Sequence, residues 1–239
     1  ILKSLSYRPR EIVEASSGNT GIALALWGRV HGIRVTVVIP KDASPERKHM
    51  LRLLGARIVE IDRNSKDEIE VAKRIARKRK AFYLGQFSRE ENPKAYISLA
   101  KELCKLRLNY FVAGVGTGGT LVGVAKYLKP KGVEIVAVLP KERTHAIQGL
   151  RKVPRSDFWK EELVDEYYYV STREARRYMH KLWNLGFLVG RSSGANLKAA
   201  LHYSKHGNVA TVFPDSWDRY LSVELDDLKI LKKNLRHAP

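Results

Sequence analysis

Two turns rich in glycine, serine and threonine hold the residue types best suited to chemistry in this chain. They are residues 16–21 (SSGNTG) and residues 116–120 (GTGGT). Each turn follows a short apolar run typical of a strand and precedes a segment with helical periodicity. The first N–H groups of a helix have no internal partner and lie at the positive end of its dipole. Both turns therefore predict sites for phosphate or carboxylate groups.

Neither turn fits the usual nucleotide-binding motifs. The chain has no Gly-x-x-x-x-Gly-Lys-Ser/Thr pattern, and no suitably placed acidic residue follows residues 114–119 to hold a ribose. Tight turns that serve only helix packing would explain one glycine-rich loop. They explain Asn19 and the flanking threonines less well, so we interpret both turns as ligand-binding.

The elements that must position these turns alternate along the chain. Strands are expected over residues 11–15, 33–39, 57–61, 81–84, 110–115, 133–139 and 208–213. Helices are expected over residues 20–31, 45–54, 66–79, 93–106, 119–128, 172–185 and 193–204, with a surface helix over residues 219–239. This alternation predicts parallel sheets joined by helical crossovers, with ligands at the carboxyl ends of the strands.

The composition of the chain limits the classes of function that are expected. The chain has 239 residues, of which 44% are hydrophobic and 29% charged, with a formal net charge of +19. The basic residues are scattered among carboxylates in helical segments, so nucleic-acid binding is not expected. No apolar run is long enough to span a bilayer. The single cysteine, Cys104, excludes an internal disulfide framework, and the seven histidines show no metal-ligand spacing, so no metal is expected.

Five motifs in order resemble those of the cysteine synthase group. These are fold type II pyridoxal-phosphate (PLP) enzymes, similar to the tryptophan synthase β subunit. The resemblance runs from about Glu11 to Ser222. The motifs are Ser17-Gly18-Asn19-Thr20-Gly21, Gly116-Thr117-Gly118-Gly119-Thr120, Ile147-Gln148-Gly149, Gly190-Arg191-Ser192-Ser193-Gly194 and Pro214-Asp215-Ser216.

The resemblance implies an α/β fold of two lobes, each with a parallel twisted sheet flanked by helices. Residues 1–90 are expected to form a smaller, mobile lobe that carries the asparagine loop. Residues 91–239 are expected to form the larger lobe that binds the cofactor phosphate. Closure of the smaller lobe would exclude water from the reaction.

The resemblance also assigns roles around the cofactor, pyridoxal 5'-phosphate. Asn19 is expected to bond its phenolic oxygen, and Ser192 to face its pyridine nitrogen, with Ser193 as the alternative if the register shifts by one. The phosphate is expected in the loop of Gly116, Thr117, Gly118, Gly119 and Thr120. A neutral hydroxyl at the ring nitrogen suits β-elimination.

The expected substrate is an amino acid with a leaving group on its side chain. Its carboxylate is expected to contact Ser16, Ser17, Thr20 and Gln86, and Gly149 and Arg151 complete the predicted substrate-binding residues. The implied reaction is a β-replacement: the leaving group departs, and sulfide adds to the resulting aminoacrylate to give L-cysteine.

The prediction of the leaving group depends on the arginines near the third motif. Arg151 and Arg155 follow it, and Arg191 adds charge in the fourth motif. A planar guanidinium is the natural partner of a phosphate, so O-phosphoserine is favoured over O-acetylserine. The alternative explanation is that these arginines belong to the generally basic surface. A cystathionine β-synthase-like activity is a further alternative.

The lysine that binds the cofactor covalently in this family does not appear at the expected place. It precedes the asparagine loop by a long stretch of chain, and Lys3 is too close to Ser17. We expect an N-terminal part, with this lysine and the first strands, upstream of Ile1. The alternative is a relative without the lysine, which binds PLP, an amino acid or a partner without turnover. The resemblance further implies a cytoplasmic homodimer.

Overall fold

The structure is a computed structural model that describes residues 1–16, 18–62 and 67–224. The chain forms two compact units. The larger unit combines Ile1–Arg8 with Leu84–Asp215, and the smaller one combines Pro9–Tyr83 with residues 216–224 of the described chain. Along the chain, the units therefore meet after residues 8, 83 and 215. Sequence reasoning expected a single boundary near residue 90. The segment after Asp215 returns to the smaller unit.

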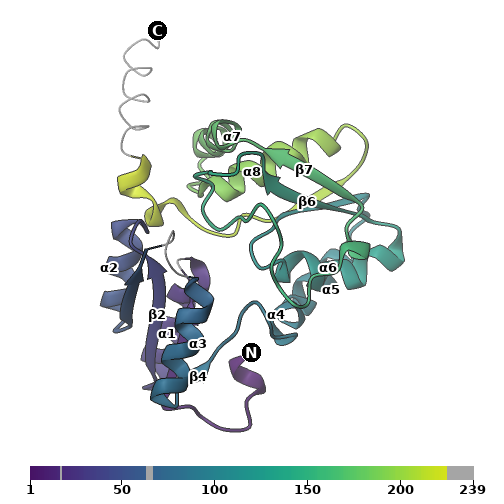
Figure 1. The fold of residues 1–239 in the computed structure, drawn as a ribbon. Coiled ribbons are helices and arrows are strands. Elements are labelled where there is room, and N and C mark those ends of the chain that lie inside the picture. The colour runs from purple at the N-terminus through teal and green to yellow at the C-terminus, as the bar shows by residue number, and fades with distance from the viewer. Residues whose placement is uncertain (17, 63–66, 225–239) are drawn as a thin grey trace, which may run out of the picture. The chain divides into compact units, whose positions relative to one another are not determined.

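The smaller unit contains a four-stranded parallel sheet with the order β3-β2-β1-β4 (Figure 1). Its strands are β1 (Glu11–Ala15), β2 (Arg34–Pro40), β3 (Arg57–Ile61) and β4 (Phe82–Tyr83). Its helices are α1 (Asn19–His31), α2 (Pro45–Leu53) and α3 (Glu68–Arg79), with a 3₁₀ turn, η4, at Trp217–Arg219.

Local sequence signals set these helix ends. Gly32 follows α1 in the left-handed region, with φ of +63°, and so ends that helix. Pro45 occupies the first position of α2, where its missing N–H costs nothing. The Asp67 carboxylate accepts a 2.8 Å hydrogen bond from the Ile69 N–H and caps α3. Val13 and Val38 then pack against apolar residues of α3 in the core.

The larger unit repeats this plan, with a parallel sheet of order β7-β6-β5-β8. Its strands are β5 (Tyr110–Gly114), β6 (Glu134–Pro140), β7 (Glu166–Val170) and β8 (Val209–Thr211). Its helices are α4 (Glu91–Lys94), α5 (Ile97–Leu103), α6 (Gly119–Leu128), α7 (Thr172–Asn184) and α8 (Arg191–Tyr203), with 3₁₀ turns η1 (Leu2–Ser4), η2 (Lys129–Lys131) and η3 (Glu161–Leu163).

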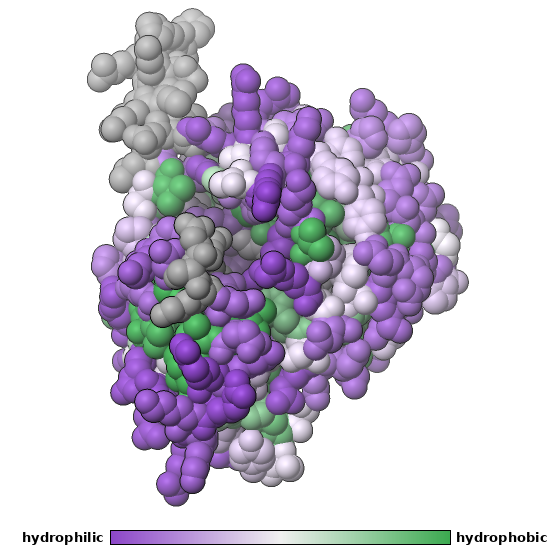
Figure 2. All heavy atoms as spheres, viewed as in Figure 1, coloured by the Kyte–Doolittle hydropathy of each residue, from purple (hydrophilic) through white to green (hydrophobic). Residues whose placement is uncertain are grey.

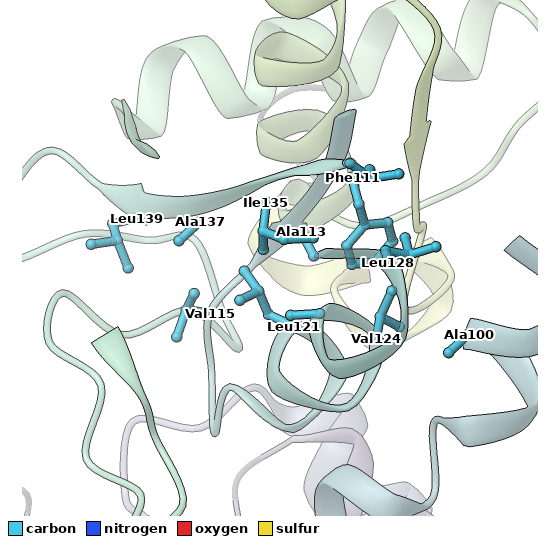
Figure 3. Close-up of a cluster of buried hydrophobic side chains, with 12 residues drawn as sticks. Ala100, Phe111, Ala113, Val115, Leu121, Val124, Leu128, Ile135, Ala137 and Leu139 are labelled. Atoms are coloured by element: carbon cyan, nitrogen blue, oxygen red, sulfur yellow. The ribbon is translucent and has the colours of Figure 1, made fainter. Parts of the chain in front are cut away.

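A fully apolar core joins the central strands of this sheet to α6. Phe111 of β5 and Ile135 of β6 are completely buried together with Leu121 and Val124 of α6. Figure 3 shows Phe111 beside Leu128 at one end of the cluster. Burial of these branched side chains contributes about 25 cal/mol per Å² of apolar surface removed from water. β5, the strand that precedes the loop at residues 116–120, is therefore held in place by this core.

Three elements differ from the sequence prediction. The helix expected over residues 93–106 is two helices, α4 and α5, separated at Ala95 and Tyr96. β7 was not predicted, although its Tyr-Tyr-Tyr-Val run has high strand propensity. Of the helix expected over residues 219–239, residues 225–239 lie outside the described residues. Tyr220 and Glu224, in the described part, are buried rather than on the surface.

The surface carries the excess of charge that the composition requires. Figure 2 shows hydrophilic side chains over most of the visible face. Among the described residues, no helix is both long and apolar enough to cross a membrane. The same residues contain no cluster of three or more side chains suited to hold a metal ion.

Candidate functional site

The two glycine-rich loops occupy equivalent places in the two sheets. β1 lies between β2 and β4, and β5 lies between β6 and β8. From each of these central strands the chain first crosses to one side of the sheet and later returns on the other. In parallel sheets, ligands bind outside the carboxyl ends of the strands at such a switch point. Residues 16–21 follow β1 and residues 116–120 follow β5, so each loop lies where its own sheet can bind a ligand.

Glycine is needed in the second loop because the backbone there is both left-handed and crowded. Gly118 precedes α6 with φ of +82°, and a Cβ on it would lie 2.6 Å from the Trp159 ring. A Cβ on Gly116 would lie 2.4 Å from the Gly149 carbonyl oxygen. The loop is therefore packed directly against the Ile147-Gln148-Gly149 segment, and sequence reasoning had placed both at one site.

Two side chains that sequence reasoning missed hold this loop. Asn92 Nδ2 donates to Thr117 Oγ1 at 3.2 Å and to the Gln86 carbonyl at 2.7 Å. Thr117 Oγ1 also accepts from the Gly119 N–H at 3.2 Å, and Ser156 Oγ donates to the Thr117 carbonyl at 2.6 Å. Asn92 thus ties the loop to the predicted substrate residue Gln86. The Asn92-Pro93 pair at a helix start is a detectable signal, whereas no local pattern marks Ser156.

The start of α8 contributes the two serines predicted near the cofactor ring. Ser192 and Ser193 are buried, and Ser193 Oγ has no hydrogen-bond partner among the described residues. α8 precedes β8 and packs on the end of β5, since a Cβ on Gly114 would lie 3.0 Å from Asn196 Oδ1. The start of α8 therefore lies at the same sheet edge as the loop at residues 116–120.

The predicted substrate residues of the larger unit lie around this loop. The Arg151 N–H donates to the Val115 carbonyl at 2.8 Å, and its guanidinium carbon lies 4.7 Å from the centre of the Phe87 ring. Phe87 follows Gln86 directly, and Gln86 is buried. Gly149 lies two residues before Arg151, with φ of +89°. Gln86, Gly149 and Arg151 are therefore brought to one place.

The other two arginines considered for the leaving group have different surroundings. Arg191 is buried, and its Nη1 donates to the Ala146 carbonyl at 3.4 Å, just before the Ile147-Gln148-Gly149 segment. Arg155 is exposed to solvent. Of the three arginines considered for a phosphate leaving group, Arg151 is the one held beside the predicted substrate residues.

The asparagine loop is organised within the smaller unit. Ser16 is buried, and its hydroxyl accepts from the N–H groups of Gly18 and Gly21 at 3.3 and 3.1 Å. Asn19 and Thr20 are the first residues of α1, and Asn19 Oδ1 accepts a hydrogen bond from Arg219. Ser17 lies outside the described residues. The contact with Arg219, two hundred residues along the chain, has no signal in the local sequence.

The helices that begin at the predicted site differ from α2, α3 and α7 in the charge of their first turn. α1, α6 and α8 have no acidic residue in their first turn. By contrast, the first turns of α2, α3 and α7 contain Glu46, Glu68 and Glu174, respectively. A carboxylate there would neutralise the positive end of the helix dipole and repel an anionic ligand. The first turns of α1, α6 and α8 keep that potential for a ligand.

Comparison with known proteins agrees with this chemistry. A family model described as pyridoxal-phosphate dependent enzyme matches residues 2–215. The chain belongs to this family. Its members use pyridoxal 5'-phosphate, so the predicted family, fold type and cofactor are confirmed. The roles assigned to single residues stay predictions.

The relatives of this PLP enzyme include cysteine synthases. A cysteine synthase of Helicobacter pylori strain J99 is 36% identical, over 88% of this chain and 76% of that protein. An O-acetylserine dependent cystathionine β-synthase of Bacillus subtilis strain 168 is 34% identical, over 90% of this chain and 77% of that protein. The solved structure of an O-ureido-L-serine synthase matches with a TM-score of 0.87 and 32% identity, over 94% and 78% of the two chains. These relatives support PLP-dependent β-replacement at the level of the family.

The described residues fit the cofactor. The loop at residues 116–120 offers N–H groups at the start of the ten-residue helix α6 without a competing carboxylate, as a phosphate requires. The buried Ser193 hydroxyl without a partner and the adjacent Ser192 are neutral donors suited to a pyridine nitrogen. Gln148 Oε1 is a further buried polar atom without a partner among the described residues.

Proposed function

We propose that this chain is a PLP-dependent sulfhydrylase that makes L-cysteine from an activated serine and sulfide, with O-phosphoserine as the favoured substrate. The observation that carries the choice of leaving group is the position of Arg151. Its guanidinium stacks on Phe87 beside Gln86, and a half-buried guanidinium recognises a phosphate dianion far better than a neutral acetyl ester.

When bound, the cofactor supplies an electron sink for the negative charge that develops at the substrate Cα. The N–H groups of residues 116–120 would hold its phosphate, and Ser192 would donate to its ring nitrogen. Asn19 would donate to its phenolic oxygen. Ser16, Ser17, Thr20 and Gln86 would hold the substrate carboxylate, and Arg151 would neutralise the departing phosphate.

The test is a comparison of kcat/KM for O-phosphoserine and O-acetylserine with sulfide as the second substrate. We expect Arg151→Met to lower kcat/KM for O-phosphoserine about a hundredfold, because one charge-assisted contact of about 3 kcal/mol is lost. The same variant should leave O-acetylserine within about threefold. Arg155→Met, an exposed arginine of the same segment, is the matched control. A wild-type preference for O-acetylserine that Arg151→Met does not alter would overturn the choice of phosphate.

A second candidate is a cystathionine β-synthase-like activity, which the Bacillus subtilis relative favours. The same activated serine would then react with the thiol of homocysteine instead of sulfide. Product analysis with both nucleophiles in one reaction separates the two activities. A cytoplasmic homodimer belongs to the same proposal.

Turnover also requires the lysine that the sequence prediction places upstream of Ile1. Intact mass of the PLP-loaded protein before and after borohydride reduction tests for it, since reduction fixes one cofactor to a lysine amine. A fixed cofactor on the purified protein supports the synthase. Reversible binding without a fixed cofactor supports the alternative of a PLP-binding relative without turnover.

A further inference from the structure

Residues 216–224 form a C-terminal strap that completes the smaller unit. The chain leaves the larger unit at Asp215 and enters the smaller one at Ser216. The strap contains η4, and within it Tyr220 and Glu224 are 3% and 1% exposed. Burial of this kind in a segment near the end of the described residues points to a specific docking site on the unit.

Three side chains at the start of α2 hold the strap. Ser44 Oγ donates to the Arg219 carbonyl at 2.9 Å. Arg47 Nη2 donates to the Tyr220 hydroxyl at 2.9 Å, and both residues are buried. Glu46 accepts from the Ser222 N–H at 2.6 Å and from its hydroxyl at 2.9 Å. The N-cap residue and the first turn of α2 thus anchor the strap at Arg219, Tyr220 and Ser222.

The anchored Arg219 reaches the asparagine loop. Its Nη1 donates to Asn19 Oδ1 at the first residue of α1. A guanidinium carries donors only, so the end of the amide that faces it must be the oxygen. The carbonyl and amino ends of an asparagine are otherwise interchangeable in shape. Arg219 therefore determines that the Asn19 N–H groups lie at the opposite end of the amide.

We propose that Arg219 is a positioning residue that sets the orientation of the Asn19 amide toward the cofactor. The phenolic oxygen of PLP needs a hydrogen-bond donor, and only the amino end of Asn19 supplies one. Arg219 acts through Asn19 and does not itself contact the cofactor. This inference rests on the proposed function, since it takes Asn19 as the partner of the phenolic oxygen.

The experiment measures the dissociation constant of PLP by equilibrium dialysis, which does not depend on turnover. The variants are Arg219→Met, Arg219→Lys, Asn19→Ala and the double variant Asn19→Ala/Arg219→Met. Arg219→Met is expected to weaken PLP binding about tenfold, the effect of one misoriented hydrogen-bonding group. Arg219→Lys keeps a donor-only head group and should stay within about threefold of wild type. The double variant should bind no more weakly than Asn19→Ala alone.

The control is Arg52→Met, which removes an exposed arginine of α2 in the same unit without a contact to Asn19. It should bind PLP as the wild type does. A second readout is the side-chain amide signal of Asn19 by NMR without cofactor, which should shift in Arg219→Met and return toward wild type in Arg219→Lys. Should Arg219→Met not fold, Arg219→Leu, which also removes the donor, takes its place with the same expectations.

The possible failures are distinguishable. A wild-type protein that does not bind PLP would overturn the proposed function and this inference with it. Normal binding by the wild type, weaker binding by Asn19→Ala and unchanged binding by Arg219→Met would overturn the inference alone. Additive losses in the double variant, or an Asn19 amide signal insensitive to Arg219, would overturn it equally.

Discussion

The loops after β1 and β5 occupy equivalent places in two sheets of the same strand order, yet they are held in different ways. The loop at residues 116–120 is enclosed by its own unit: Trp159 and Gly149 crowd its glycines, and Asn92 and Ser156 bond to Thr117. In the described part of the loop at residues 16–21, the Ser16 hydroxyl bonds to the N–H groups of Gly18 and Gly21, a Cβ on Gly21 would lie 2.7 Å from the Ser16 carbonyl oxygen, and the distant Arg219 bonds to Asn19.

This difference suits the two different roles that the sequence predicts for the loops. A loop packed on all sides keeps its N–H groups in place before any ligand arrives, which suits the constant phosphate of a cofactor. The loop at residues 16–21, whose Gly18 has open space around it, would be able to adjust around the substrate that the sequence predicts there. Substitutions that compare the two loops test this division.

The largest contrast is expected between Gly118→Ala and Gly18→Ala. Alanine at position 118 would be strained at φ of +82° and would overlap the Trp159 ring, at a cost of about 3 kcal/mol in the free energy of unfolding. A Cβ at Gly18 meets no atom within 4 Å, so that variant should stay within about 0.5 kcal/mol of wild type. Urea denaturation measures both, and equal losses would contradict the difference between the loops.

Asn92→Ala should have the next largest effect. It removes two hydrogen bonds and leaves the Gln86 carbonyl and Thr117 hydroxyl short of a donor, so we expect a loss of about 2 kcal/mol in stability. PLP binding should also weaken because the loop loses its link to residue 86. The exposed Lys94 of the same helix provides the control variant Lys94→Ala, which should alter neither quantity.

Ser16→Ala should cost less, about 1 kcal/mol, because the N–H groups of Gly18 and Gly21 lose one shared acceptor. Ser204→Ala, which removes an exposed hydroxyl at the end of α8, should cost only a few tenths of that. If Ser16→Ala proved as harmful as Gly118→Ala, the first loop would be as tightly held as the second.

The smallest effect is the pH dependence of the strap. Burial alone would raise the pKa of Glu46, but hydrogen bonds from its own N–H and from Ser222 and Ser44 lower it below the ordinary 4.5. The strap contact is therefore fully stabilising above that value and is lost as the pH falls through the lower pKa of the folded state. Stability of Glu46→Gln measured between pH 6 and 3 should lack this contribution. A wild-type protein with the same pH profile as Glu46→Gln would show that the Ser222 contact contributes nothing.

Much of this molecule follows from local signals. The end of α1 before Gly32, the start of α2 at Pro45 and the apolar run of β2 each have a short-range cause. All three are present in the structure. β7 was missed because it is a half-exposed edge strand whose tyrosines lack a clean alternation of apolar and polar residues. The division of residues 93–106 into two helices depends on packing, since a Cβ on Gly123 would lie 2.2 Å from the Pro93 carbonyl.

Prediction of the site from the sequence has the same limit, because it depends on local signals. Sequence motifs placed the glycine loop, Gln86 and Arg151 together, and the larger unit does bring them together. Asn92, Ser156 and Arg219 were missed because their roles depend on partners 25, 39 and 200 residues away. The Asn92-Pro93 pair marks a helix start but not the bond to Thr117, and Ser156 and Arg219 have no local pattern that would reveal their contacts.

The return of the strap has a consequence for how the chain is made. Residues 9–83 leave the ribosome before residues 84–215 of the larger unit are synthesised, and Tyr220 follows only after them. Until then Arg47, which is 4% exposed in the finished protein, has no Tyr220 to bond. The smaller unit is therefore completed only after residues 84–215 have been synthesised. A nascent chain of this protein must keep an unfinished smaller unit from aggregating while the inserted larger unit folds.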